Sequence, residues 1–205
     1  MSDSSESPTP LQPATTDAAA TSSAPRRRDA GEVKPRRFLI VLWALALGVV
    51  GVDQLTKVWA VAALSDGHRV QLLGDWLSFV LIRNPGAAFS FATGQTWIFA
   101  LIAIAVTVVV IRVSRRLGSM WWAVALGLVL GGAVGNLIDR LMRAPGFLRG
   151  HVIDFIDYGG AFVGNVADIA IVCAAVIIMV LSVRGREIDG THVGEGKGRH
   201  AEPAA

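Results

Sequence analysis

The sequence predicts an all-α membrane protein of four transmembrane helices, with a small extracytoplasmic sheet and disordered termini. Of its 205 residues, 53% are hydrophobic and only 17% are charged. A soluble domain of this size needs a more polar surface. The apolar residues also gather in long continuous runs, rather than at the spacing of an amphipathic helix or strand. These two observations predict membrane spans.

Each apolar run is long enough to cross roughly 30 Å of hydrocarbon at about 1.5 Å per helical residue. Glycines follow one another at four-residue spacing in the third run, at Gly127, Gly131 and Gly135. This spacing predicts a flat helix face that a neighbouring helix can approach closely. The expected spans are Phe38 to about Ala63, about Ala92 to Ile111, about Met120 to Ile138, and about Val166 to Val183.

Polar tails flank the span region. Residues 1–35 are of low complexity and poor in large apolar side chains, so we expect them to be disordered. Residues 186–205 are polar and rich in glycine, and we expect no fold there. Residues 36–185 form the predicted four-span domain.

Basic residues indicate the orientation of the spans. Arginines cluster before the first span, at Arg112, Arg115 and Arg116 between the second and third, and at Arg184 after the fourth. Cytoplasmic loops carry the excess of lysine and arginine, so both termini are predicted to lie in the cytoplasm. The net charge of +3 therefore reflects orientation rather than binding to nucleic acid.

The outer segment after the first span contains a run of β-forming residues, Trp76–Ile82, preceded by the turn-like Gly74 and Asp75. This pattern predicts a small sheet or hairpin at the membrane interface.

Polar residues interrupt the spans at a single depth. Because the topology alternates, these groups all lie toward the outer leaflet. An ionised side chain at this depth costs a few kcal/mol unless it is paired or hydrated, so their convergence indicates a site. The groups are Asp53, Gln54 and Lys57; Arg83 and Asn84; Asn136, Asp139 and Arg140; and Asn165 and Asp168.

Some of these residues are better explained as scaffold than as chemistry. Asp53 and Lys57, at i and i+4, are interpreted as an ion pair, and Asp139 as the partner of an arginine. Asp154, in the second outer segment, and Asp168 have fewer cationic neighbours in the sequence. They are the candidate reacting groups.

Carboxylate chemistry is the reaction type that remains. No histidine lies in a predicted span and Cys173 has no nearby base, so a metal site and thiol catalysis are not expected. Two carboxyls that share a site have split pKa values, which supplies a base to activate water and an acid to protonate a leaving amine. Such a pair titrates as a unit, and which aspartate is the base stays open.

Short motifs at these positions resemble the lipoprotein signal peptidase, or signal peptidase II, family. The resemblance covers about Phe38 to Val183. Its motifs, in order, are Asp53–Lys57, Asn84–Phe89, Gly135–Arg140, Val152–Phe155 and Asn165–Asp168.

The resemblance implies an aspartic endopeptidase of the bacterial inner membrane with an outer β-cradle. It implies removal of the signal peptide from diacylglyceryl-modified prolipoproteins by cleavage before the lipidated cysteine. It also implies no cofactor, no metal and no nucleic-acid partner, and a monomer in contact with membrane lipids. The implied catalytic pair is Asp154 and Asp168. Asn84, Asn136, Arg140 and Asn165 would hold the substrate backbone and the site geometry, supported by Asp53, Lys57 and Asp139.

Two other functions stay open. A small four-span transporter or channel could use the polar layer as an ion or proton site. This reading is disfavoured because the polar residues do not continue toward the cytoplasm. A membrane scaffold without activity would leave the unpaired aspartates unexplained.

Overall fold

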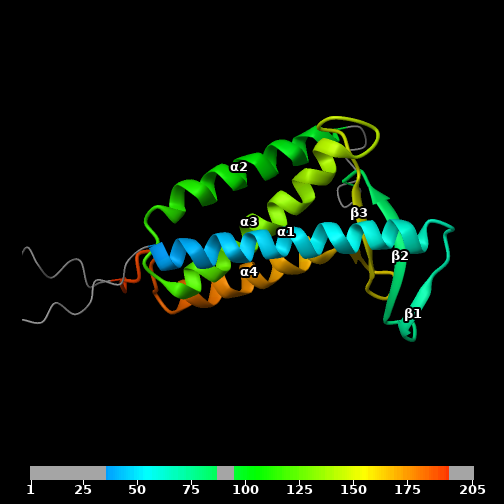
Figure 1. Ribbon diagram of the computed structural model, residues 1–205. Helices are drawn as coiled ribbons and strands as arrows, with labels where there is room; N and C mark the ends of the chain where they lie inside the picture. The colour runs from blue at the N-terminus through cyan, green and yellow to red at the C-terminus, as the bar shows by residue number, and fades with distance from the viewer. Residues whose placement is uncertain (1–35, 87–94, 194–205) are drawn as a thin grey trace, which may run out of the picture. The chain divides into compact units, whose positions relative to one another are not determined.

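Four helices in the described part of the chain are long and apolar enough to cross a membrane (Figure 1). The computed structural model describes residues 36–86 and 95–193. The four-span prediction is confirmed, although the expected start of the second span near residue 92 lies outside the described residues. The helices are α1 (Arg36–Leu64), α2 (Thr96–Ser114), α3 (Met120–Met142) and α4 (Val166–Val183).

A four-stranded antiparallel sheet lies at the end of the bundle opposite the first residues of α1 (Figure 1). The predicted hairpin is confirmed as β1 and β2, and the sheet continues into β3 and β4 from the second outer segment. Ile82 pairs with Asp154 and Asn84 with Val152, which makes Asn84 and Asp154 diagonal neighbours on one face. The strands are β1 (Val70–Leu73), β2 (Leu77–Asn84), β3 (Val152–Asp157) and β4 (Val163–Gly164).

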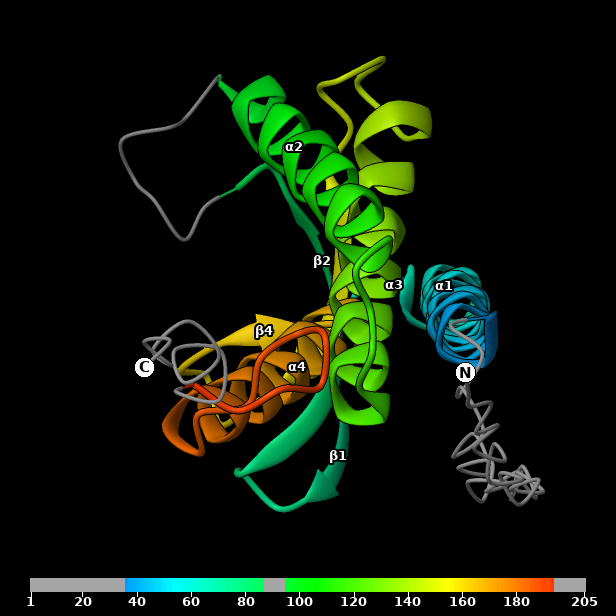
Figure 2. The same cartoon turned by 90° about the vertical axis from the view of Figure 1, so that its left-hand side faces the viewer.

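Helix α3 is the central helix, and it packs against α1, α2 and α4 (Figure 2). In α3, 56% of the apolar stretch is buried, against 17–22% in the other three helices. The exposed apolar side chains on α1, α2 and α4 are therefore available to contact lipid.

The predicted glycine face of α3 lies against α1. A Cβ added at Gly127 would lie 2.9 Å from the Leu42 carbonyl oxygen. One added at Gly131 would lie 2.6 Å from Val49 Cβ and 2.9 Å from the Ala46 carbonyl oxygen. Side chains at these positions would therefore push the two helices apart, as the sequence pattern predicts.

Two apolar clusters hold the two ends of the bundle. The larger one joins α1, α2, α3 and α4 near the start of α1 and the end of α4, and it includes Leu42, Trp122 and Leu130. The smaller one joins the last turns of α1 to β3 through Ala60, Leu64, Ile153 and Phe155.

The chain after α4 is folded as far as residue 193, which differs from the tail expected there. Arg186 and His192 form a β-bridge. The Trp122 indole donates to the Arg186 carbonyl, and Gly118 N–H donates to the Ile188 carbonyl. The physical reason is Ile188, which packs against the larger cluster and so anchors a mostly polar turn.

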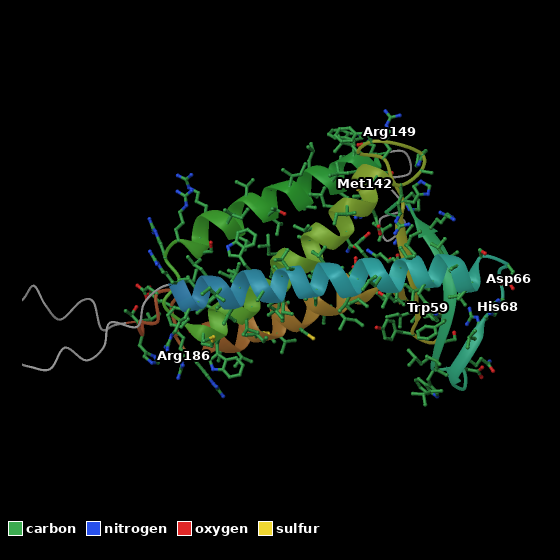
Figure 3. All side chains as sticks on the ribbon, in the orientation of Figure 1. Trp59, Asp66, His68, Met142, Arg149 and Arg186 are labelled. Carbon is green, nitrogen blue, oxygen red and sulfur yellow. The ribbon has the colours of Figure 1, made fainter. Side chains whose placement is uncertain are left out.

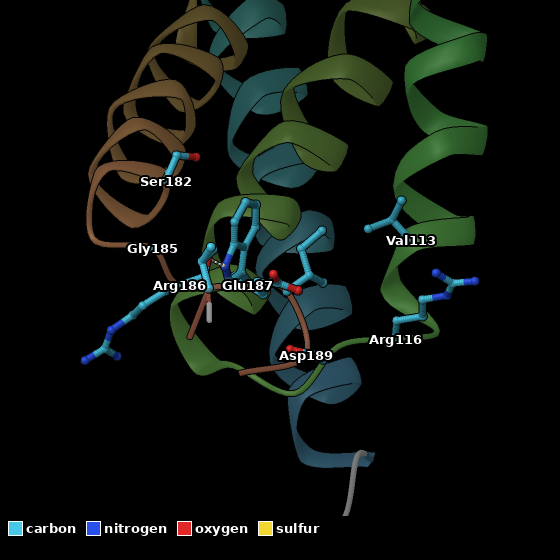
Figure 4. Close-up of a pocket in the computed structure, with 10 residues that line it drawn as sticks. Val113, Arg116, Ser182, Gly185, Arg186, Glu187 and Asp189 are labelled. Atoms are coloured by element: carbon cyan, nitrogen blue, oxygen red, sulfur yellow. Dashed lines mark hydrogen bonds between the residues drawn. The ribbon is translucent and has the colours of Figure 1, made fainter. Parts of the chain in front are cut away.

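A cavity of about 540 Å³ lies beside this turn, between the ends of α2 and α4 (Figure 4). The disorder predicted for residues 1–35, and for the tail beyond residue 193, falls outside the described residues.

The glycine face yields a stability prediction. Gly131→Ala should lower the free energy of unfolding by about 1–3 kcal/mol, because the new methyl group overlaps the α1 backbone and Val49. Thermal unfolding in detergent micelles measures this. Gly48→Ala is the matched control, since nothing lies within 4 Å of its added Cβ, and it should leave the stability unchanged or slightly raised. Equal stability of the two variants would contradict the close contact.

Candidate active site

All of the predicted site residues lie in one hydrogen-bonded network, where α1, α3 and the start of α4 meet β2 and β3. The sequence separates them by more than a hundred positions, and helix packing together with the β2–β3 pairing brings them together. The network has a charged part around Lys57 and a second part around Asp154 and Asp168.

Lys57 is fully buried between two fully buried carboxylates. Its Nζ lies 2.8 Å from Asp53 Oδ2, on the same helix, and 2.8 Å from Asp139 Oδ2 on α3. Arg143 Nε lies 2.6 Å from Asp139 Oδ1, so the arginine that pairs with Asp139 is Arg143 rather than Arg140. Two cations and two anions meet here, and the buried group is neutral overall.

The same carboxylates accept backbone N–H groups from other elements. Asp53 Oδ1 accepts from Ala167 N at 3.0 Å, which fixes the first turn of α4 against α1. Asp139 Oδ2 accepts from Ile153 N at 3.2 Å, which fixes β3 against α3. Ala167 directly precedes Asp168 and Ile153 directly precedes Asp154. The charged cluster therefore positions the two candidate reacting residues.

The amide of Asn136 connects the charged cluster to Asp168. Its Oδ1 accepts from Lys57 Nζ at 3.0 Å and from Asn165 Nδ2 at 3.2 Å. Because lysine can only donate, the Asn136 oxygen must face Lys57. Its Nδ2 then donates to Asp168 Oδ1 at 2.9 Å.

Asn84 and Asn165 are oriented in the same way and donate to Asp154. Asn84 Oδ1 accepts from Gly86 N, and its Nδ2 donates to Asp154 Oδ2 at 2.7 Å. Asn165 Oδ1 accepts from Asp168 N, and its Nδ2 donates to Asp154 Oδ1 at 2.7 Å. Each oxygen of Asp154 therefore accepts one amide N–H.

Asn165 and Asp168 together cap the start of α4. Its Oδ2 accepts from Asn165 N at 3.1 Å, while Asn165 accepts from Asp168 N, so the two residues form a capping box at the start of α4. Asn165 thus bonds to both Asp154 and Asp168, which holds the two carboxyls on the same side of the bundle.

Asp154 lies on β3, outside the spans, and burial raises the pKa of its carboxyl. It is 2% exposed, and burial raises its pKa to about 6, although the amides of Asn84 and Asn165 oppose this. The negative charge of Asp168 raises it further. A carboxyl with this pKa can exchange a proton near neutral pH.

Both carboxyls border one cavity of about 190 Å³. Arg140 lies at its edge, where its guanidinium interacts electrostatically with both aspartates and lies 5.7 Å from the Phe99 ring centroid. Among the described residues, Arg140 Nε is buried without a hydrogen-bond partner, so a donor remains for a bound molecule.

Sequence reasoning did not identify the other residues that line this cavity. They are apolar or glycine. Gly86 and Val152 fall within the motifs quoted above, whereas nothing in the pattern separates Phe99 and Phe162 from ordinary packing residues. The Asn84 motif continues into residues 87–89, which lie outside the described residues. The unidentified lining residues are Gly86, Phe99, Val152 and Phe162.

Residues 45–184 match the family described as signal peptidase (SPase) II. The chain belongs to this family. The resemblance seen in the sequence motifs is thereby confirmed, and signal peptidase II is an aspartic peptidase, which agrees with the carboxylate chemistry expected from the sequence.

Individual signal peptidases are similar to this chain over most of its length. The lipoprotein signal peptidase of Rhodococcus jostii (strain RHA1) is 52% identical over 155 residues, covering 76% of this chain and 78% of that protein. That of Mycobacterium avium (strain 104) is 48% identical over 165 residues, covering 80% of this chain and 91% of that protein.

A solved structure shares the fold. It is described as a bacterial membrane enzyme, determined by the in meso method at 1.9 Å resolution. The TM-score is 0.61 at 25% sequence identity, covering 73% of this chain and 94% of that one.

Removal of the buried cation should destabilise this signal peptidase. Lys57→Met leaves Asp53 and Asp139 buried with one fewer positive charge, so the free energy of unfolding should fall by about 3–5 kcal/mol. Unfolding in detergent measures this. His68→Gln, which removes an exposed partner of Asp66, is the control and should leave the stability unchanged, because solvent screens this pair. A tolerated Lys57→Met would show that the ion cluster does not hold the bundle.

The raised pKa of Asp154 predicts a pH dependence of stability. Its carboxyl binds a proton more tightly in the folded protein, with a pKa of about 6, than in the unfolded chain, where the ordinary value is 3.8. Tighter proton binding by Asp154 therefore stabilises the folded protein fully below about pH 4. This stabilisation, roughly 3 kcal/mol, is lost as the pH rises to about 6.

Asp154→Asn removes that titration. The stability of the variant relative to the unchanged protein should rise between pH 4 and pH 7 and then level off, as measured by unfolding at a series of pH values. A stability difference that is constant with pH would contradict the assigned pKa.

Proposed function

We propose that this chain removes the signal peptide from diacylglyceryl-modified prolipoproteins, by hydrolysing the peptide bond before the lipidated cysteine, with Asp154 and Asp168 as the catalytic pair. The observation that carries this proposal is the cavity that both carboxyls border at one end of four membrane-spanning helices. Asn165 bonds to both of them. The relatives named lipoprotein signal peptidase support the substrate class.

The reaction requires one proton distributed over the two carboxyls. The ionised aspartate accepts a proton from water as the water oxygen attacks the scissile carbonyl carbon, and the protonated aspartate gives its proton to the leaving nitrogen. The peptide C–N bond breaks without a covalent enzyme intermediate. The amides of Asn84, Asn136 and Asn165 hold the carboxyls in place throughout.

Arg140 is proposed to hold the substrate backbone. Its Nε donor has no partner in the described part of the chain, and the side chain lines the cavity that both aspartates border. A hydrogen bond to a peptide carbonyl beside the scissile bond would fix the substrate and satisfy this buried donor.

The membrane setting suits a substrate that is itself an apolar helix. Arg112 and Arg116 lie at the end of the bundle opposite the sheet, as does Arg36, and we propose that this end is cytoplasmic. The site then faces the outer leaflet, where the cleavage point of a membrane-inserted signal peptide meets water. All of the proposed site residues come from one chain, which supports an active monomer.

Replacement of either aspartate tests the proposal. Asp154→Asn and Asp168→Asn should each lower the rate of cleavage of a lipidated precursor peptide by at least about 100-fold, because each removes a proton-transfer group. Purified protein in detergent and a gel-shift or mass-spectrometric readout measure this. Circular dichroism checks that both variants are folded.

Asp189→Asn is the matched control, since this exposed residue lies at the other end of the bundle, and it should cleave normally. Full activity of either site variant would reject the catalytic pair. Equal cleavage of precursors with and without the diacylglyceryl group would reject the proposed substrate class.

A further inference from the structure

The β1–β2 hairpin presents large apolar side chains that no other described element covers. Leu73 is 67% exposed and Trp76 is 84% exposed, and both lie beside the turn between the strands. Leu72 and Val70 are also exposed. Figure 2 shows the hairpin projecting beyond the helices. On a soluble protein, an exposed apolar patch of this kind marks a site of contact with another protein or with a membrane.

The length of α1 places this hairpin at the edge of the bilayer. From Arg36 to Trp59 the helix rises about 34 Å at 1.5 Å per residue, which is slightly more than the roughly 30 Å of hydrocarbon. The next residues, Ala60 and Leu64, pack against β3. The sheet therefore lies level with the lipid headgroups.

The lipid-facing surface of α1 continues into the hairpin. Leu55 and Val58 are exposed on the spanning part of α1, and Trp59 follows them. The Trp59 ring meets Phe79 of β2 edge to face, with 5.3 Å between centroids (Figure 3). Phe79 in turn pairs with Val70 across the hairpin. An apolar path therefore runs from the membrane span to the hairpin without a charged residue in it.

We propose that the tip of the β1–β2 hairpin, Leu72 to Trp76, inserts into the lipid leaflet at the sheet end of the bundle and anchors the sheet there. The occupant of this surface is lipid rather than protein because the surface is continuous with the lipid-facing side of α1. Asp75 is the only charged residue between positions 70 and 77, so the tip can enter the headgroup and upper acyl region. Tryptophan is the residue type that favours this depth.

The anchor acts on the candidate active site through the strand pairing. Strand β2 pairs with β1 on one side and with β3 on the other, and β3 carries Asp154. Fixing the hairpin in the leaflet therefore fixes the depth of Asp154 relative to the lipid. This inference depends on the four spans and the sheet, not on the proposed catalytic roles.

Spin labels measure the depth of the tip directly. Nitroxides are attached at Leu73→Cys and Trp76→Cys, each in a Cys173→Ala background, in protein reconstituted into phosphatidylglycerol–phosphatidylethanolamine vesicles. Collision rates with oxygen, which dissolves in hydrocarbon, and with a water-soluble nickel chelate are compared. Asp66→Cys is the matched control, since this exposed residue follows the end of α1 and lies beyond the sheet (Figure 3).

Labels at positions 73 and 76 should collide several-fold more with oxygen, relative to the nickel chelate, than the label at position 66. Water-like values at both tip positions would overturn the proposal. So would protection from both reagents, which would reveal a protein contact or a second copy of the chain. A second measurement avoids the cysteine variants and uses quenching of tryptophan fluorescence by brominated lipids. The amount of fluorescence lost should be smaller in Trp76→Phe than in the unchanged protein. An equal loss in the two proteins would also overturn the proposal.

Discussion

The burial of Lys57 between Asp53 and Asp139 is the interaction on which the rest of the structure depends. A charge without a partner at this depth would cost several kcal/mol, so the cation and its carboxylates must meet with good geometry. That requirement holds α1 and α3 in one register. Through the remaining carboxylate oxygens it also orients Ala167 N on α4 and Ile153 N on β3. One neutral cluster thereby fixes α1, α3, α4 and β3 relative to one another, and β2, which carries Asn84, is held through its pairing with β3.

The asparagine amides transmit this order to the reacting groups. The side-chain oxygen of each asparagine accepts a hydrogen bond from a group that can only donate. The NH₂ group of each asparagine therefore faces a carboxyl. Asp154 and Asp168 consequently accept hydrogen bonds from neutral donors, and among the described residues neither forms an ion pair. Burial can then raise the pKa of Asp154, which a salt bridge in the same place would prevent. A proton is therefore available to the pair near neutral pH.

Close packing of α1 on α3 makes the cluster possible. The added Cβ at Gly135 would lie 2.7 Å from Asp53 Oδ2, so a larger residue there would displace the carboxylate that binds Lys57. The same glycine face further along α3 sets the distance between the helices at Gly127 and Gly131. At the sheet end of the bundle, α1 and the surrounding lipid hold the sheet in place. The cavity therefore has one rigid wall of helices and one of strands.

The sequence by itself determined the spans, the polar layer within them and the identity of its residues. The reason is that the length of an apolar run, and a charged residue inside such a run, can both be read from a short stretch of sequence. It also indicated the family through short ordered motifs. Tertiary structure alone decided the partners: Arg143 rather than Arg140 for Asp139, and Asn84 for Asp154. It decided equally that residues 186–193 fold through Ile188. Contacts between distant segments depend on strand register and on the rotation of each helix about its axis. A short segment of sequence does not determine either of these.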